Sequence, residues 1–298
     1  MTDAHDADDS TPGLLALLEP EDAGGDLFVG NNPGDWPGGR VFGGLVAGQA
    51  LRAATLTVRP DHVVHSLHGY FMRPGRTGTP INYRVARVRD GRSFTTRTVV
   101  ADQGEEAIFT LTSSFHKAED GHEYQLAMAT DVPDPDSTPE PDLPFARMRS
   151  MSHMEMREVG PTEPSPDGTY RSTRRVWLRA VQELPEDPGV HASVMTFMSD
   201  MGVVMAARPP REGVPWEAMM GASLDHAVWF HRPPRADEWL LYDLHALSNH
   251  GARGMVRGVM HDRHGTLLAS VAQEALIRPL PPGTTPHWRE GPELRPER

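Results

Sequence analysis

The sequence predicts an α+β fold made of two tandem modules, in each of which an antiparallel β-sheet wraps around one long central helix. Two observations lead to this prediction. A helix-like segment followed by strand-like segments occurs on both sides of an acidic, proline-rich stretch, and matching strands are separated by an offset of 159 or 160 residues. Internal similarity at one offset is typical of a duplicated module. A sheet with one polar face must bury its other face, here against the helix.

Each module begins with a helix candidate. In the first module, residues 41–51 are rich in small side chains, which permit close packing against a sheet. In the second module, residues 190–207 carry Val194, Met201 and Met205 at helical spacing, so these side chains form one apolar stripe. We interpret this stripe as part of the hydrophobic core.

The strands that follow the helices repeat in the same order. The tetrapeptide Phe-Met-Arg-Pro at 71–74 returns as Phe-His-Arg-Pro at 230–233. Two further strands of alternating polarity follow in each module, joined by turns. The matching ranges are 94–100 with 254–260, and 108–115 with 267–274. We therefore expect both modules to contain the same antiparallel strands.

Acidic runs divide the chain into segments. Residues 1–39 hold nine acidic residues and no Lys or Arg, and residues 118–146 hold eight, again with no Lys or Arg. The second run is also rich in proline, which is typical of an extended, solvated linker. The predicted segments are an acidic N-terminal segment with the first strand (1–39), the first module (40–117), the acidic Pro-rich linker (118–146), the second module (147–280) and a C-terminal tail (281–298).

The composition excludes several classes of protein. The chain has no Cys, so disulfide frameworks, thiolate metal sites and a Cys nucleophile are excluded. The net charge of −12 argues against nucleic-acid binding. Residues 40–117 nevertheless hold 11 basic and 5 acidic residues, a net charge of +6 that suits a phosphorylated ligand. No apolar run reaches the roughly 18–20 residues of a membrane span, and the acidic N-terminus has no signal-peptide pattern, so we predict a cytoplasmic protein without membrane insertion.

Neither the spacing of the histidines nor a known nucleophile or phosphate-binding motif indicates a class of enzyme. His62, His65 and His68 lie three residues apart, which on a strand directs neighbours to opposite faces, so no metal site is predicted. The chain also lacks a Gly-x-Ser-x-Gly elbow and a phosphate-binding loop. The pair Asp225-His226 is either an acid–base pair or, as we favour, a capping and hydrogen-bonding strand start.

Several long motifs occur in the order typical of one enzyme family. They are Val-Phe-Gly-Gly at 41–44, His-Ser-Leu-His-Gly-Tyr-Phe-Met-Arg-Pro-Gly at 65–75, Arg-Asp-Gly-Arg-Ser-Phe at 89–94, Leu-Asp-His-Ala-Val-Trp-Phe-His-Arg-Pro at 224–233 and Gln-Glu at 273–274. With these motifs the chain resembles the type II acyl-CoA thioesterases, from residue 42 to residue 277 except for the linker. The resemblance implies a double hotdog fold, hydrolysis of acyl-CoA to a free acid and CoA in fatty acid metabolism, and no cofactor.

The same resemblance implies three catalytic residues, Asp200, Ser223 and Gln273. The family has Thr at the position of Ser223, and this change keeps the hydroxyl group. An Asp can accept a proton from the attacking water, while a hydroxyl and an amide orient that water. Backbone N–H groups near the start of a central helix can stabilise the oxyanion. Without the resemblance, an isolated Asp on a helix is ordinarily exposed, and the other two are ordinarily structural hydrogen-bonding residues.

Substrate binding requires cations for the phosphates of CoA. The chain has a single lysine, Lys117, so arginines must supply most of these contacts. We predict this role for Arg73 and Arg92. Gly43 and Gly44 are predicted to let the backbone approach the substrate closely.

Two other functions stay open. One is a non-catalytic acyl-CoA-binding protein that keeps the fold and the cleft. The other is an enoyl-CoA hydratase, whose pattern has a His five residues after the Asp; here that position is Met205. In each case the partner is an acyl-CoA, and the edges of the fold leave a homo-oligomer open.

Overall fold

The computed structural model describes residues 13–34, 36–141, 153–159, 173–207, 218–281 and 283–284. The first half contains α1 (Leu14–Leu18), β1 (Glu21–Gly24), β2 (Leu27–Gly30), the 3-10 helix η1 (Pro37–Gly39), α2 (Gly43–Thr55), β3 (His62–Phe71), β4 (Ile81–Asp90), β5 (Phe94–Gln103) and β6 (Glu106–Lys117). The rest contains the 3-10 helix η2 (Pro135–Ser137), β7 (Met154–Val159), β8 (Thr173–Ala180), α3 (Pro188–Ser199), α4 (Val203–Ala206), β9 (Met219–Ser223), β10 (Asp225–Phe230), β11 (Leu240–His250), β12 (Arg253–Asp262) and β13 (Leu267–Pro279).

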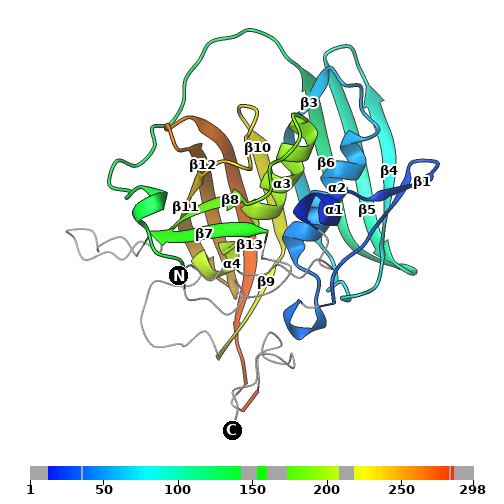
Figure 1. The fold of residues 1–298 in the computed structure, drawn as a ribbon. Helices are drawn as coiled ribbons and strands as arrows, with labels where there is room; N and C mark the ends of the chain where they lie inside the picture. The colour runs from blue at the N-terminus through cyan, green and yellow to red at the C-terminus, as the bar shows by residue number, and fades with distance from the viewer. Residues whose placement is uncertain are drawn as a thin grey trace, which may run out of the picture.

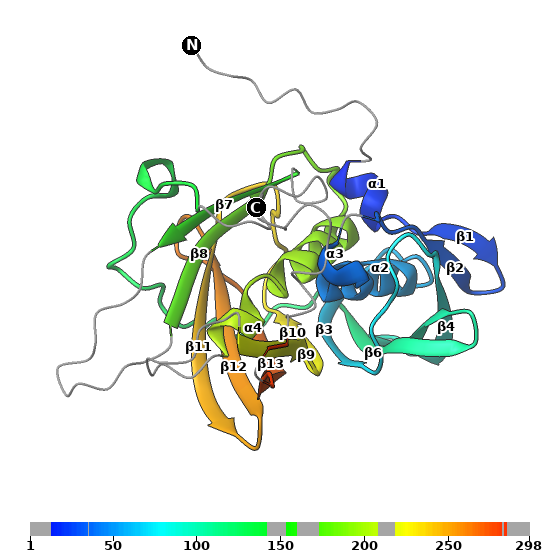
Figure 2. The same cartoon turned by 90° about the horizontal axis from the view of Figure 1, so that it is seen from below.

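Within these ranges all thirteen strands belong to one antiparallel sheet. Its order is β1-β2-β4-β5-β6-β3-β10-β13-β12-β11-β8-β7, with β9 paired to β13. The sheet curves around α2 and α3, which lie side by side at its centre (Figures 1 and 2). This arrangement confirms the predicted α+β double hotdog. No helix among the described residues has the length and apolar character needed to cross a membrane.

The two halves of the sheet join through equivalent strands. In the antiparallel pair β3–β10, Tyr70 lies opposite Asp225 and Ser66 lies opposite Trp229. With the offset of 159, Tyr70 corresponds to Trp229 and Asp225 corresponds to Ser66, so the first pair is equivalent to the second. A local two-fold axis therefore relates the halves, and the sheet continues across this seam.

The small residues of α2 were expected to permit close packing against a sheet. In the structure they also allow α2 to approach α3 closely. A Cβ added to Gly44 would lie 2.4 Å from the carbonyl oxygen of Phe197, and one added to Gly48 would lie 3.0 Å from that of Ser193. Both carbonyls belong to α3. The opposite side of α2 packs on β5 and β6, so the helix pair forms the centre of the hydrophobic core.

The second predicted helix, 190–207, is wrong as a continuous element. The structure ends α3 at Ser199 and begins the short α4 at Val203. Gly202 lies between them with a φ of 76°, a left-handed conformation that ends helices and that glycine adopts without steric cost. A Cβ there would also collide with the guanidinium of Arg174. This break turns Asp200 into the residue that caps α3.

The acidic linker contacts the second module over much of its described part. Residues 118–141 are extended and mostly exposed, and they arch from the first half to the second (Figure 1). The indole of Trp177 donates to the Pro133 carbonyl at 3.0 Å. Arg263 binds Asp134 at 2.8 Å and Asp136 at 2.6 Å. The acidic run is thus held by arginines of the second module. Linker residues 142–146 lie outside the described residues.

Candidate active site

Asp200 lies where α3 ends and α2 begins. Its side chain is buried, with 5% of the residue exposed. The backbone N–H of Gly44, in the first turn of α2, is close enough to the carboxylate to favour its charged form. A Cβ on Gly43 would lie 2.7 Å from Oδ2 of Asp200. Of the two glycines predicted for substrate binding, Gly43 therefore makes room for this carboxylate, at the positive end of a helix dipole, whereas Gly44 makes room for the Phe197 carbonyl.

The structure brings the three predicted catalytic residues together. The hydroxyl of Ser223 donates to Oδ1 of Asp200 at 3.2 Å. The amide nitrogen of Gln273 donates to the Ser223 hydroxyl oxygen at 2.8 Å. These residues come from α3, β9 and β13, so three separate elements converge on one buried polar cluster.

An irregularity between β9 and β10 directs two side chains into this cluster. Ser223 lies opposite Ala275 of β13. Ala227 lies opposite Ala272. Between these two pairs, the three residues 224–226 of one strand lie opposite the two residues 273–274 of β13. The extra residue is a β-bulge, which reverses the alternation of side chains along the strand. Ser223 and His226, three residues apart, can therefore point to the same side of the sheet.

Burial controls the ionisation of the cluster. Removal from water raises the pKa of Asp200, although His226, Gln273, Ser223 and the Gly44 amide all favour the charged carboxylate. Burial also lowers the pKa of His226, despite the nearby Asp200 carboxylate. A carboxylate with a raised pKa is a stronger base than an exposed one, which suits proton transfer from water.

His226 was considered in the sequence only as part of the Asp225-His226 pair, and its place in the Asp200 cluster was not predicted. It is fully buried, and its ring nitrogens contact Gln273 Oε1 at 2.5 Å and Ser199 Oγ at 2.7 Å. The neighbouring Asp225 does have a structural role, because it accepts from the Glu274 amide at 2.7 Å. The available signal was a histidine in an otherwise apolar strand, but the bulge that turns it inward depends on pairing with β13.

The two predicted arginines do not form one site. Arg73 is exposed, donates to the Ala107 carbonyl at 3.0 Å, and follows β3 at the end nearest Gly43. Arg92 is near the opposite end of β3, where Arg59 donates to its carbonyl at 3.4 Å. The length of β3 therefore separates them. Among the described residues, no three His, Asp or Glu side chains form a group that could hold a metal ion.

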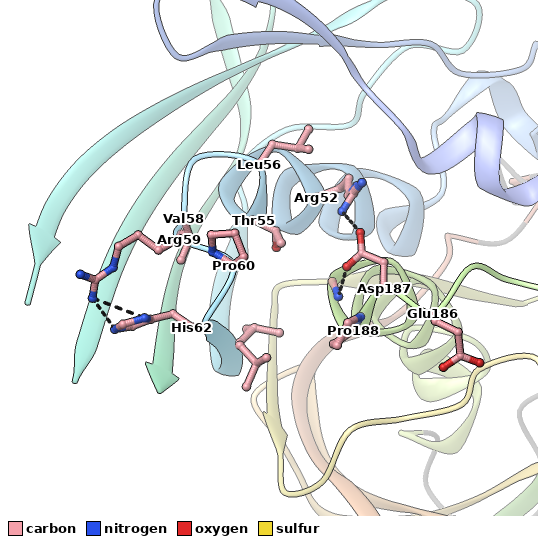
Figure 3. Close-up of a pocket in the computed structure, with 13 residues that line it drawn as sticks. Arg52, Thr55, Leu56, Val58, Arg59, Pro60, His62, Glu186, Asp187 and Pro188 are labelled. Atoms are coloured by element: carbon pink, nitrogen blue, oxygen red, sulfur yellow. Dashed lines mark hydrogen bonds and ion pairs between the residues drawn. The ribbon is translucent and has the colours of Figure 1, made fainter. Parts of the chain in front are cut away.

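A cavity of about 450 Å³ lies at the other end of the helix pair, where α2 ends and α3 begins (Figure 3). Asp187 caps α3 by accepting from the Gly189 amide at 2.8 Å. The same carboxylate pairs with Arg52 of α2 at 3.0 Å. The start of α3 is therefore already occupied by a carboxylate from its own N-cap residue.

The local two-fold axis relates this cavity to the Asp200 cluster, because each lies where one central helix begins and the other ends. Counting from the first residue of each helix, Thr55 of α2 stands in the place of Asp200. The offset of 159 brings Val64 to the place of Ser223. The carboxylate and the hydroxyl bonded to it are thus present at one end of the helix pair only.

Comparisons with known proteins agree over most of the chain. A family model described as acyl-CoA thioesterase matches residues 149–276, and one described as acyl-CoA thioesterase N-terminal domain matches residues 32–116. Acyl-coenzyme A thioesterase 8 of Homo sapiens is 36% identical, over 89% of this chain and 88% of its own length. Acyl-CoA thioesterase 2 of Haemophilus influenzae is 31% identical, over 89% and 96%. The crystal structure of the acyl-CoA thioesterase II TesB2 from Mycobacterium marinum has a TM-score of 0.76 and 38% identity, covering 90% of this chain and 99% of that one.

Proposed function

Since the chain belongs to the type II acyl-CoA thioesterase family and is a thioester hydrolase, we propose that it converts acyl-CoA to a free acid and CoA with a water activated by Asp200. The observation that carries the mechanism is the hydrogen-bonded series from Gln273 through Ser223 to Asp200. These groups have the chemistry that water activation needs, namely one base and two orienting polar groups.

In the proposed reaction the water attacks the thioester carbonyl carbon while Asp200 takes one of its protons. The new C–O bond forms, and the carbonyl oxygen gains negative charge. The first turn of α2, which already provides the Gly44 amide to Asp200, is the nearest source of helix-dipole stabilisation for this charge. The C–S bond then breaks, and the proton passes from Asp200 to the CoA sulfur. Water adds across the thioester bond, so no covalent enzyme intermediate forms.

The proposal implies a defined dependence on pH. Hydrolysis requires ionised Asp200, whose pKa burial raises above the ordinary carboxyl range. Activity should therefore decrease as the pH is lowered through that raised pKa, earlier than it would for an exposed carboxylate. Orientation and general-base assistance by such a group contribute about 10²–10⁴-fold to a rate.

For CoA binding we retain Arg73 as the candidate closer to the Asp200 cluster, with Gly43 and Gly44 at the cluster itself. Arg73 is exposed, and its ion pair with the exposed Glu106 is long, at 3.5 Å. A phosphate can therefore compete with Glu106 for the guanidinium. Arg92, at the opposite end of β3, is the weaker candidate. A cytoplasmic location, a role in fatty acid metabolism and formation of homo-oligomers stay predictions.

The test is thiol release from a panel of acyl-CoA substrates of different chain length, with wild type beside Asp200→Asn. We expect loss of about 10²–10⁴-fold in kcat for the variant. Asp243→Asn is the matched control, because Asp243 is a buried carboxylate on β11 that pairs with Arg175 outside the cluster. Equal activity of Asp200→Asn and wild type would refute the mechanism. Tight acyl-CoA binding without thiol release by the wild type would favour a non-catalytic binder instead.

A further inference from the structure

In the polar cluster around Asp200, the chemistry of the side chains determines which group donates and which accepts in each hydrogen bond. An ionised carboxylate only accepts hydrogen bonds, so Ser223 must give its single hydroxyl proton to Asp200. The Ser223 oxygen then accepts from an amide N–H of Gln273. The carbonyl oxygen of that amide therefore faces His226, and Nδ1 of the imidazole must carry a proton to donate to it.

The other imidazole nitrogen must be an acceptor. His226 is fully buried, and burial lowers its pKa, so the ring is neutral and carries one proton. With that proton on Nδ1, Nε2 presents a lone pair to Ser199 Oγ at 2.7 Å. The Ser199 hydroxyl is also within donating distance of the Thr196 carbonyl, at 2.9 Å. Its single proton can serve only one of the two acceptors, and beside a neutral ring protonated on Nδ1 it serves Nε2. The hydrogen bonds therefore run one way, from Ser199 to Asp200.

We propose that His226, in its Nδ1–H tautomer, is a positioning residue that fixes the orientation of the Gln273 amide. The inference rests on the proposed function, because it concerns the geometry of the same reaction. The two ends of a glutamine amide are similar in shape, and Gln273 is fully buried, so bulk water cannot select one orientation. With the amide reversed, its oxygen would face Ser223 and compete with Asp200 for the hydroxyl proton. His226 acts against this reversal.

The first experiment compares two substitutions at one position. His226→Leu removes the donor, whereas His226→Asn keeps an N–H group near the place of Nδ1. We expect His226→Leu to lower kcat by about 100-fold, as small misplacements of catalytic groups do, with a smaller change in KM. His226→Asn should recover about tenfold of this loss. The control is His191→Asn, because His191 is also buried but accepts from the Ala236 amide away from the cluster. Wild-type kcat in His226→Leu would overturn the proposal.

A double-mutant cycle separates positioning from general support of the fold. If His226 acts through Gln273, His226→Leu should have little further effect in a Gln273→Leu background, since the amide is already absent. Independent losses that multiply would contradict the proposal. Folding of every variant is checked by its thermal unfolding transition.

Nitrogen-15 NMR of histidine-labelled wild type tests the tautomer directly and needs no measurement of activity. The signals of His226 among the 15 histidines are identified by their absence in His226→Asn. Nδ1–H is the expected form, and an Nε2–H ring or an imidazolium at neutral pH would overturn the inference. Asp200→Asn with wild-type activity would instead refute the proposed function, and it would not alter the tautomer result.

Discussion

Replacing Asp200 by Asn is expected to stabilise the fold while it removes the base. The side chains have nearly the same shape, and an Asn oxygen can still accept from Ser223 and from the Gly44 amide. What changes is the charge. Because burial outweighs the hydrogen bonds and raises the pKa of Asp200, the charged carboxylate is less favourable in the folded protein than in the unfolded chain.

The magnitude follows from two opposing effects. A hydrogen bond to a charged group contributes about 1.5–3 kcal/mol and a neutral one about 0.5–1.5 kcal/mol, so two weakened bonds cost about 2–3 kcal/mol. Burying a charged carboxylate costs several kcal/mol, and the direction of the pKa shift says that this cost is the larger. We therefore expect a net gain of about 1 kcal/mol and a rise in Tm of about 2 °C at pH 8.

The difference in stability between Asp200→Asn and wild type is expected to depend on pH. A carboxyl whose pKa is higher in the folded than in the unfolded state favours folding at low pH, and this advantage is lost as the pH rises through the folded-state pKa. The Tm of Asp200→Asn should thus exceed that of wild type most at pH 8, and the difference should shrink as the pH falls and vanish below about pH 3, where the carboxyl is protonated in both states. Differential scanning calorimetry at several pH values measures this. A lower Tm for the variant at pH 8, or a difference independent of pH, would refute the reasoning.

Three further changes test the packing. Gly44→Ala should lower the free energy of unfolding by about 1–3 kcal/mol and reduce activity, because its Cβ would lie 2.4 Å from the Phe197 carbonyl, whereas Gly34→Ala has open space around it; equal Tm values would contradict this. Gln49→Leu should lower stability in urea unfolding by about 2–4 kcal/mol, because this buried amide bonds three partners outside α2; a neutral effect would show that they find other partners. Arg263→Ala should speed proteolysis within 118–141 at unchanged Tm, and an unchanged cleavage rate would show that its ion pairs do not hold the linker.

The sequence predicted those features that depend on local pattern. Alternating strands and one offset predicted the two modules and their antiparallel strands, and the apolar stripe predicted a buried helix. The missed features depend on contacts between distant segments. At Gly202 the guanidinium of Arg174 leaves no room for a Cβ, and the inward turn of His226 reflects one extra residue opposite β13. Likewise, Arg73 and Arg92 were grouped by charge, which contains no information on which end of β3 each occupies.

The seam between β3 and β10 also affects how the two ends of the helix pair can change. In an assembly of two identical chains, one substitution alters both symmetry-related sites at once. Here the equivalent strands belong to one polypeptide, so the 450 Å³ cavity and the Asp200 cluster can accumulate substitutions separately. Covalent linkage also keeps the halves at a high effective concentration, so their pairing does not weaken on dilution. A single copy of this chain therefore carries one complete cluster, and a variant at either end reports on that end alone.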